Sequence, residues 1–195
     1  MSESSASARR RRNPEQTRAA IIAALLDAIH DGELDPTGKR IAARAGVSER
    51  SVFVHFPGRD DLRVAVVEVQ SERVEALIAT PDPQLPLIER IDAVVRQSEA
   101  IFTLQRNPRL LGLLESHTVP GVDARMRLTD RRIRDALARA FAPELTGADG
   151  IDEELLDLVD ATVGWPTRHH LVDRRGRSQA EASTAIRRAL FALLD

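Results

Sequence analysis

The apolar residues of this chain recur at intervals of three and four, a spacing that limits the fold to packed helices. In residues 15–30, for example, Ile22, Leu25, Leu26 and Ile29 return to one face of a helix. No segment alternates apolar and polar residues as a half-buried strand does, and no repeat is present. The spacing therefore predicts an all-α fold of about nine helices without a sheet.

Prolines and glycines divide this periodicity into separate helices. The helices are expected over about residues 15–30, 37–44, 48–54, 59–79, 87–106, 108–117, 120–141, 151–173 and 178–194. Pro108 is expected in the first turn of its helix, and Pro166 is expected to kink the helix that contains it. The two prolines of residues 80–83 interrupt the chain after helix 59–79.

The composition excludes several classes of protein. The 195 residues are 43% hydrophobic, which suffices for a core, and 30% charged, and no apolar run approaches the length of a membrane span. Cysteine is absent, which excludes disulfides, thiolate zinc sites and iron–sulfur clusters. The first residues lack the apolar stretch of a secretory signal. We therefore expect a cytoplasmic protein with no membrane partner.

Charge is spread unevenly along the chain, although the formal net charge is only −2. Residues 1–13 are polar, include four arginines at 9–12, and are expected to form a disordered basic arm. This arm is either a solubilising tail or a segment that contacts DNA. Residues 36–59 contain five basic residues against Glu49 alone, which predicts a positive face on one part of the protein.

Residues 37–62 read TGKRIAARAGVSERSVFVHFPGRDDL, a pattern typical of two short helices joined by a tight turn. Ala42 and Ala45 are small enough for two helices to cross closely. Gly46 supplies the positive φ that the turn requires, and Ser48 is suited to cap the second helix. This arrangement is a helix-turn-helix, whose second helix enters the major groove of DNA.

The same stretch carries Ile41-Ala42, then Ala45-Gly46-Val47-Ser48, FVHF at 53–56 and PGRDDL at 57–62. On these residues it resembles the N-terminal signature of the tetracycline-repressor (TetR) family of one-component regulators, over about residues 15–65. The resemblance implies a helix-turn-helix DNA-binding domain at 14–60 and a helical ligand-binding and dimerisation domain at 61–195. Helix 59–79 would link the two, and the partners would be an operator in double-stranded DNA and a second copy of the chain.

Carried over residue by residue, the resemblance implies eight residues that contact DNA. They are Thr37, Lys39, Ser48, Arg50, Ser51, Phe53, His55 and Arg59. The forked donors of Arg50 fit O6 and N7 of guanine, whereas Arg59 at a helix start would favour a phosphate. Phe53 stands where the family usually has tyrosine, and we expect it to be partly buried. Each polar residue has an ordinary alternative role, as a cap for Ser48 and as solvated charge for Arg50.

The C-terminal part offers two further candidate surfaces. Small and apolar residues on the last two helices form a candidate dimer interface, comprising Leu155, Val159, Ala182, Ala185, Ile186, Ala189 and Leu193. The alternative is that they face the protein's own core. A largely aliphatic ligand pocket is predicted around Phe102, Leu110, Leu114, Met126 and Trp165, for an unidentified small-molecule effector. The alternative here too is a core that simply packs.

Nothing in the sequence points to catalysis. P-loop, GxGxxG, GxSxG and HExxH motifs are absent, and His117, His169 and His170 lack the spacing of metal ligands. We therefore predict no enzyme activity, no cofactor and no metal. The sequence favours a transcriptional repressor that a ligand releases from its operator. The alternatives are a helical ligand-binding protein or enzyme in which the helix-turn-helix is only structural, and a DNA-binding regulator without an effector.

Overall fold

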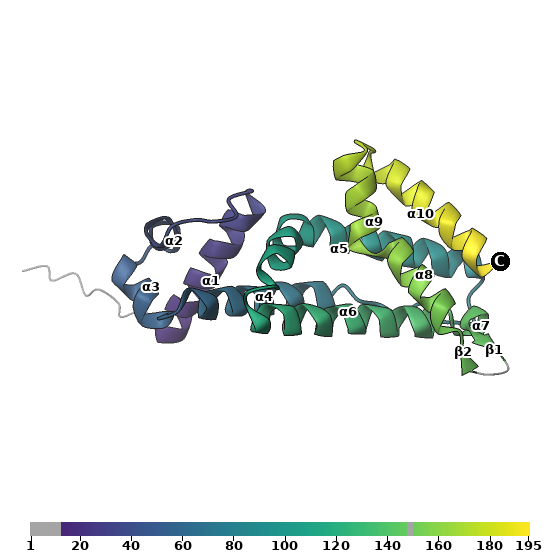
Figure 1. Ribbon diagram of the computed structural model, residues 1–195, viewed down its shortest axis with the longest axis horizontal. Helices are drawn as coiled ribbons and strands as arrows, with labels where there is room; N and C mark the ends of the chain where they lie inside the picture. Colours follow the sequence, from purple (N-terminus) through teal and green to yellow (C-terminus); the bar gives the residue numbers. More distant parts are fainter. Residues whose placement is uncertain (1–12, 148–149) are drawn as a thin grey trace, which may run out of the picture. The chain divides into compact units, whose positions relative to one another are not determined.

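The computed structural model describes residues 13–147 and 150–195, which are mostly helical (Figure 1). The helices are α1 (Pro14–His30), α2 (Gly38–Ala45), α3 (Glu49–His55), α4 (Arg59–Glu75), α5 (Leu87–Glu115), α6 (Pro120–Ala140), α7 (Ala142–Leu145), α8 (Glu153–Val163), α9 (Trp165–His169), the π-helix η1 (His170–Arg174) and α10 (Gln179–Leu194). The prediction of an all-α fold is confirmed. Residues 1–12, most of the predicted basic arm, lie outside the described residues. Asn13, which we had assigned to that arm, caps α1 by accepting a hydrogen bond from the Glu15 amide.

The expectation that no sheet would occur is wrong in one detail. Strands β1 (Thr146–Gly147) and β2 (Gly150–Ile151) pair antiparallel. Each strand is only two residues long, so neither can show the alternation of apolar and polar residues by which a strand is recognised. The pair connects α7 to α8 and changes nothing in the helical character of the fold.

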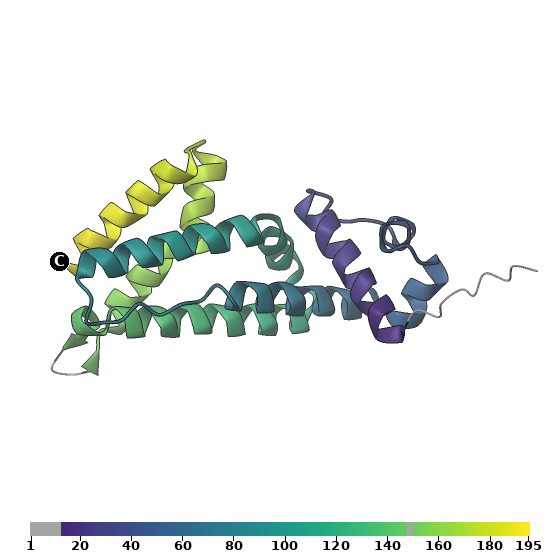
Figure 2. The same cartoon turned by 180° about the vertical axis from the view of Figure 1, so that it is seen from behind.

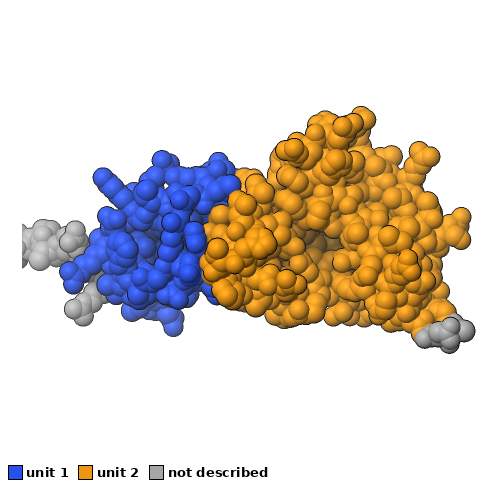
Figure 3. Space-filling model, in the orientation of Figure 1, with its two compact units in different colours: residues 1–66 blue, residues 67–195 orange. Residues whose placement is uncertain are grey.

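Two compact units make up the chain, residues 1–66 and 67–195 (Figure 3). The division falls inside α4, which runs without a break from Arg59 to Glu75. The sequence predicts a boundary at 60/61 and a helix that extends to residue 79. In the structure the first unit therefore also includes the first turns of α4, and the helix ends four residues early.

Unit 1 has a core of branched apolar residues from each of its helices. Ile21, Leu26 and Ile29 of α1 are buried, as are Ile41 of α2 and Val52 of α3. The turn between α2 and α3 forms as the sequence predicts, since Gly46 has a φ of 65°. The guanidinium of Arg18 lies 4.7 Å from the ring centre of the buried Phe56, which secures the end of α3 against α1.

Unit 2 is built around α5, which packs against α6, α9 and α10 (Figures 1 and 2). Its core gathers apolar residues from α5, α6, α7, α8 and α10. These are Ile91, Val94, Val95, Leu137, Ala140, Phe141, Leu145, Leu156, Val159, Val163, Ile186, Leu190 and Leu194. The π-helix η1 and the capped start of α10 follow α9 directly, and Ser178 and Glu181 form a reciprocal capping box there.

Pro108 does not begin a helix, as the sequence predicted, but lies inside the single long helix α5. Proline has no amide hydrogen, so the carbonyl of Leu104, four residues earlier, lacks its usual helical donor. The side-chain amide of Gln70 in α4 donates to that carbonyl at 3.1 Å. The buried Gln70 thus supplies from another helix the hydrogen bond that Pro108 cannot make.

The helix predicted over residues 151–173 is divided into α8, α9 and η1. Gly164 ends α8 in an extended conformation (φ −63°, ψ 160°), and Pro166 then occupies the first turn of α9. Proline is favourable there because the first amides of a helix have no helical acceptor. Pro166 therefore starts a helix, whereas we expected it to kink one.

Replacing Gln70 with methionine should lower the free energy of unfolding by about 1–3 kcal/mol, because the Leu104 carbonyl loses its donor in a buried place. The change should cost less in a Pro108→Ala background, where the alanine amide can satisfy the same carbonyl. A double-mutant cycle in urea measures this coupling. Equal costs in the two backgrounds would show that Gln70 does not compensate for the proline.

Candidate DNA-binding surface and ligand cavity

The outward face of α3 combines one cation with two apolar side chains. Arg50 is exposed and makes no ion pair within the described residues. Phe53 is 59% exposed and Val54 is 67% exposed. The expectation that Phe53 is partly buried is therefore wrong, because Val52 and Phe56 alone turn toward the core from this part of the chain. An exposed apolar patch beside a cation suits contact with base edges and thymine methyl groups.

Val54 is the residue of this face that our sequence analysis missed. It follows Arg50 by four residues in a helix, so the two side chains lie on the same side. The helical periodicity alone could have found it. The family resemblance implies contacts by Phe53 and His55 but none by Val54. His55 is half-buried.

The predicted hydroxyl contacts have structural roles within unit 1. The Ser48 hydroxyl caps α3 by accepting from the Ser51 amide at 3.1 Å, and the two hydroxyls lie 2.8 Å apart. The Thr37 hydroxyl caps α2 by accepting from the Arg40 amide at 3.3 Å. All three residues lie at helix starts near α3 or α2, where capping and a contact with DNA are compatible.

The positive face predicted from residues 36–59 is largely neutralised by acids just before it. Asp31 pairs with Arg44 at 2.6 Å, Glu33 pairs with Arg40 at 2.8 Å, and Asp35 pairs with Arg59. Residues 31–59 hold five basic and four acidic residues, a net charge of +1. Residues 36–59 alone are more positive because these acids lie directly before Pro36. Arg50 and the exposed Lys39 are the cations of this segment without an ion pair among residues 13–147 and 150–195.

The start of α4 is less suited to a phosphate than the sequence suggested. Arg59 already pairs with Asp35, and the Asp61 carboxylate accepts from the Gly58 amide at 3.2 Å. Asp60 and Asp61 both lie in the first turn, where they interact favourably with the helix dipole. Any phosphate at this position must compete with three carboxylates, so Arg59 is a weaker candidate than Arg50.

Unit 2 contains a cavity of about 250 Å³ between α5, α6, α8 and α9, and Figure 3 shows that the visible face of this unit is hollowed. Phe102 and Trp165 line it, as predicted. Leu110, Leu114 and Met126 do not. Leu114 is 63% exposed, and the sulfur of the buried Met126 packs against Gly112 instead. The helix α5 continues through Pro108, which turns this part of its surface away from the cavity.

Polar side chains also line the cavity, contrary to the aliphatic lining that the sequence predicted. The Arg109 guanidinium donates to Asp130 at 2.9 Å. Asp160 faces the same space, and burial raises the pKa of its carboxyl group, although Arg134 opposes that rise. The indole nitrogen of Trp165 and Nε of Arg109 are buried and lack an acceptor within the described part of the chain. The cavity therefore has an acidic acceptor beside an arginine–aspartate ion pair.

The predicted dimer residues divide into two groups in the single chain. Val159, Ala182 and Ile186 are fully buried in the core of unit 2. For these three, the packed-core alternative applies. Ala185 and Ala189 are exposed on α10, and Leu155 and Leu193 are half-buried. Leu158, which the prediction omitted, is 48% exposed on α8. The outward apolar face of α8 and α10 therefore contains fewer of the predicted residues. It also includes Leu158, which the prediction did not contain.

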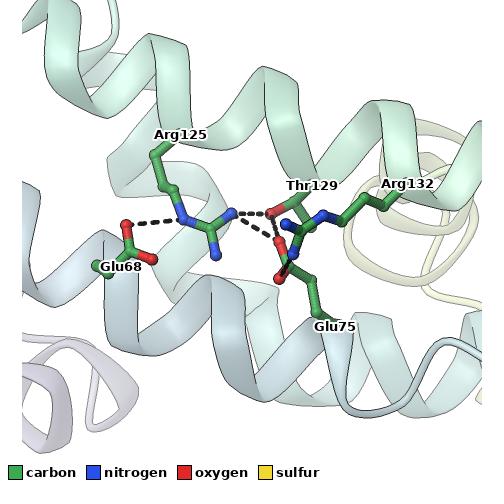
Figure 4. Close-up of polar contacts among 5 residues, drawn as sticks. All are labelled: Glu68, Glu75, Arg125, Thr129 and Arg132. Atoms are coloured by element: carbon green, nitrogen blue, oxygen red, sulfur yellow. Dashed lines mark hydrogen bonds and ion pairs between the residues drawn. The ribbon is translucent and has the colours of Figure 1, made fainter.

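A partly buried ion cluster connects α4 to α6 inside unit 2 (Figure 4). Arg125 of α6 donates to Glu68 at 2.8 Å and to Glu75 at 2.6 Å, and the Thr129 hydroxyl donates to Glu75 at 2.8 Å. Arg132 pairs with the other oxygen of Glu75. Burial alone would raise the pKa of Glu75, but the hydrogen bonds and charges of these partners outweigh burial and lower it.

Two other kinds of site are absent from the described residues. No helix is long and apolar enough to cross a membrane. Histidine, aspartate and glutamate nowhere gather in the groups of three or more that hold a metal ion, within residues 13–147 and 150–195. His169 instead stacks on Trp165, with ring centres 4.4 Å apart, and contacts Asp173.

Comparison with known proteins gives a sequence match in the N-terminal part of the chain and a shared fold over most of its length. Residues 21–66 match the family model of bacterial regulatory proteins of the tetR family. A tetR-family transcriptional regulator from Streptomyces coelicolor shares the fold with a TM-score of 0.74, at 19% identity over 92% of this chain and 80% of that one. No curated protein sequence matches. Residues 21–66 thus match the tetR family by sequence, and the chain shares its fold with the solved structure.

Two further solved structures have the same fold. A putative TetR-family regulator from Mesorhizobium loti MAFF303099 has a TM-score of 0.71, at 16% identity over 93% of this chain and 96% of that one. The multidrug binding protein EbrR, in complex with imidazole, has a TM-score of 0.68, at 19% identity over 91% and 94% of the two chains. At these identities the likeness concerns the fold.

Glu75→Gln should lower the free energy of unfolding by about 3 kcal/mol at neutral pH, because it leaves Arg125 buried with only the half-exposed Glu68. The loss should shrink as the pH falls below about 4, since the lowered pKa of Glu75 stabilises the fold only while the carboxylate is ionised. Urea unfolding at several pH values measures both effects. Asp123→Asn, which breaks the exposed pair with Arg127, is the control and should cost under about 1 kcal/mol.

Proposed function

We propose that this protein is a transcriptional regulator that binds an operator as a homodimer and is released from it by a small-molecule ligand. The observation that carries the proposal is the outward face of α3, where Arg50 lies beside exposed Phe53 and Val54 in a helix-turn-helix of the tetR family. In this proposal Arg50 reads guanine and the two apolar side chains contact thymine methyl groups. Six other predicted residues would contact the DNA backbone and so position the protein: Thr37, Lys39, Ser48, Ser51, His55 and Arg59.

The exposed apolar face also argues against a merely structural helix-turn-helix. A helix that served only packing would bury Phe53 and Val54, whereas both are more than half exposed. Positive charge supports DNA binding less strongly than exposure does, because Arg40, Arg44 and Arg59 are paired with acids. That the protein has no enzymatic activity, and that it acts in the cytoplasm, remain predictions.

Support for a ligand comes from the cavity and from one relative. The cavity of unit 2 is bounded by four helices and lined by Phe102, Trp165 and several polar groups. The relative EbrR is a multidrug binding protein whose structure contains imidazole. Asp130 lines the cavity from α6, and the neighbouring Thr129 bonds to Glu75 of α4. A ligand that moves α6 therefore also acts on the helix that continues into unit 1.

Arg50→Ala should weaken binding to the operator by about 1–3 kcal/mol and relax the preference at one base pair. Lys39→Ala should weaken binding to all sequences alike and reduce the salt slope by about one. Titration of DNA from immediately upstream of the gene, at several salt concentrations, tests both. Arg73→Ala, which removes an exposed charge from unit 2, is the matched control. An Arg50 variant that binds like the control would refute the assignment of the reading residue.

Ala189→Glu should convert a dimer into monomers. Residue 189 is exposed in the single chain, but dimerisation through the proposed α8–α10 interface would bury the new carboxylate without a counter-charge. Since Ala189 is exposed in the single chain, the substitution should not disturb the fold of the protomer. Light scattering during gel filtration measures the mass. Ala180→Glu, on the opposite side of α10, is the control and should remain dimeric. Wild-type protein that runs at 21.5 kDa at micromolar concentration would refute the dimer.

A further inference from the structure

The cavity of unit 2 has a net negative charge that its own residues do not neutralise. Three ionisable side chains line it, Arg109, Asp130 and Asp160. Arg109 pairs with Asp130 at 2.9 Å, which leaves Asp160 as the excess charge. No hydrogen-bond donor or cation contacts the Asp160 carboxylate in the described residues. An ionised carboxylate in such a partly desolvated place is unfavourable unless a positive group joins it.

The nearest candidate counter-ion within the protein is already occupied. Arg134 is the cation that most favours the ionised form of Asp160. Its guanidinium, however, donates to Glu153 at 2.6 Å and pairs with Asp157 at 2.6 Å. Two exposed carboxylates thus hold Arg134 at the outer side of α8 and α6. Asp160 is left facing the cavity without a partner.

Other groups in the cavity define what else a ligand would offer. Phe102 and Trp165, with ring centres 6.2 Å apart, supply aromatic surface, and aromatic faces attract organic cations. The volume of about 250 Å³ corresponds to about eight water molecules, which limits the ligand to a single ring with short substituents.

We propose that the effector of this protein is a small aromatic monocation. Its positive group pairs with Asp160, and its ring packs against Phe102 and Trp165. The inference rests on the proposed function, because it names the ligand class for the same cavity. An anionic ligand is disfavoured, since Asp130 already neutralises Arg109 and a second negative charge would repel Asp160.

Three probes of one shape and different charge test the ligand class. The probes are the permanent cation 1-methylnicotinamide, its neutral isostere 3-methylbenzamide and the anion 3-methylbenzoate. Trp165 is the only tryptophan of the chain and lines the cavity, so its fluorescence reports binding directly. We expect the cation to bind at least about ten-fold more tightly than the neutral isostere, and the anion to bind most weakly. A cation that binds no better than its isostere, or not at all at millimolar concentration, would overturn the proposal.

Asp160→Asn should abolish the preference for the cation while leaving the affinity for the neutral isostere within about two-fold. Glu154→Gln, which removes an exposed charge of α8 outside the cavity lining, is the matched control and should keep the preference. Equal effects of the two variants would show that the general field of α8, and not a contact with Asp160, selects the ligand. Operator binding without ligand is measured in parallel. Failure of the wild-type protein to bind the operator refutes the regulator, whereas an absence of charge selectivity in the wild-type protein refutes only the ligand class.

Discussion

The attachment of α4 to unit 2 depends on the buried guanidinium of Arg125. A buried arginine is costly unless its charge is compensated and its donors are bonded, and both carboxylates that pair with Arg125 come from α4. Glu68 and Glu75 are seven residues apart, two helical turns, so they lie on one face of that helix and meet α6 together. Removing Glu75 leaves the buried Arg125 guanidinium with only the half-exposed Glu68. The position of the second half of α4 is therefore fixed by charge pairing as well as by apolar packing.

Polar contacts from distant parts of the chain recur throughout unit 2. Gln70 of α4 satisfies a carbonyl of α5, and Arg90 of α5 makes two hydrogen bonds of 2.5 and 2.6 Å to Glu144 of α7. Arg168, fully buried in α9, bonds to Gln179 and Ser183 at distances of 3.2 and 3.1 Å. Apolar side chains fill space without direction, whereas each of these contacts requires one register. The register of the helices of unit 2 is accordingly specified by several polar pairs.

Local signals explain what could be predicted from the sequence. The turn at Gly46, the cap at Ser48 and the start of α10 at Ser178 depend on neighbours within four residues, and each is present in the structure. The continuation of α5 through Pro108 depends on Gln70, thirty-eight residues earlier in the chain. No local rule contains that information, since proline inside a helix is normally unfavourable.

The candidate site shows the same division between local and distant information. Which residues α3 exposes follows from its period, and Val54 was within reach of that rule. Whether a cation of this segment is free or paired could not be predicted from residues 36–59. Arg40, Arg44 and Arg59 are paired with acids that precede this segment. The cavity lining was likewise beyond reach, since Asp130 and Asp160 belong to different helices that the fold brings to one space.

Helix α6 connects the chemistry of the cavity to that of α4 through adjacent residues. Asp130 faces the cavity and holds Arg109, while Thr129 beside it donates to Glu75, and Arg125 lies one turn earlier. A ligand shifts an equilibrium only through contacts that differ between the two states. A cation at Asp160 approaches the Arg109–Asp130 pair from the same cavity and alters the charge that this pair experiences. The coupling free energies of 1–3 kcal/mol that are typical of such regulation correspond to the loss of about one buried polar contact, so a change confined to the ion pairs of α6 is sufficient in magnitude.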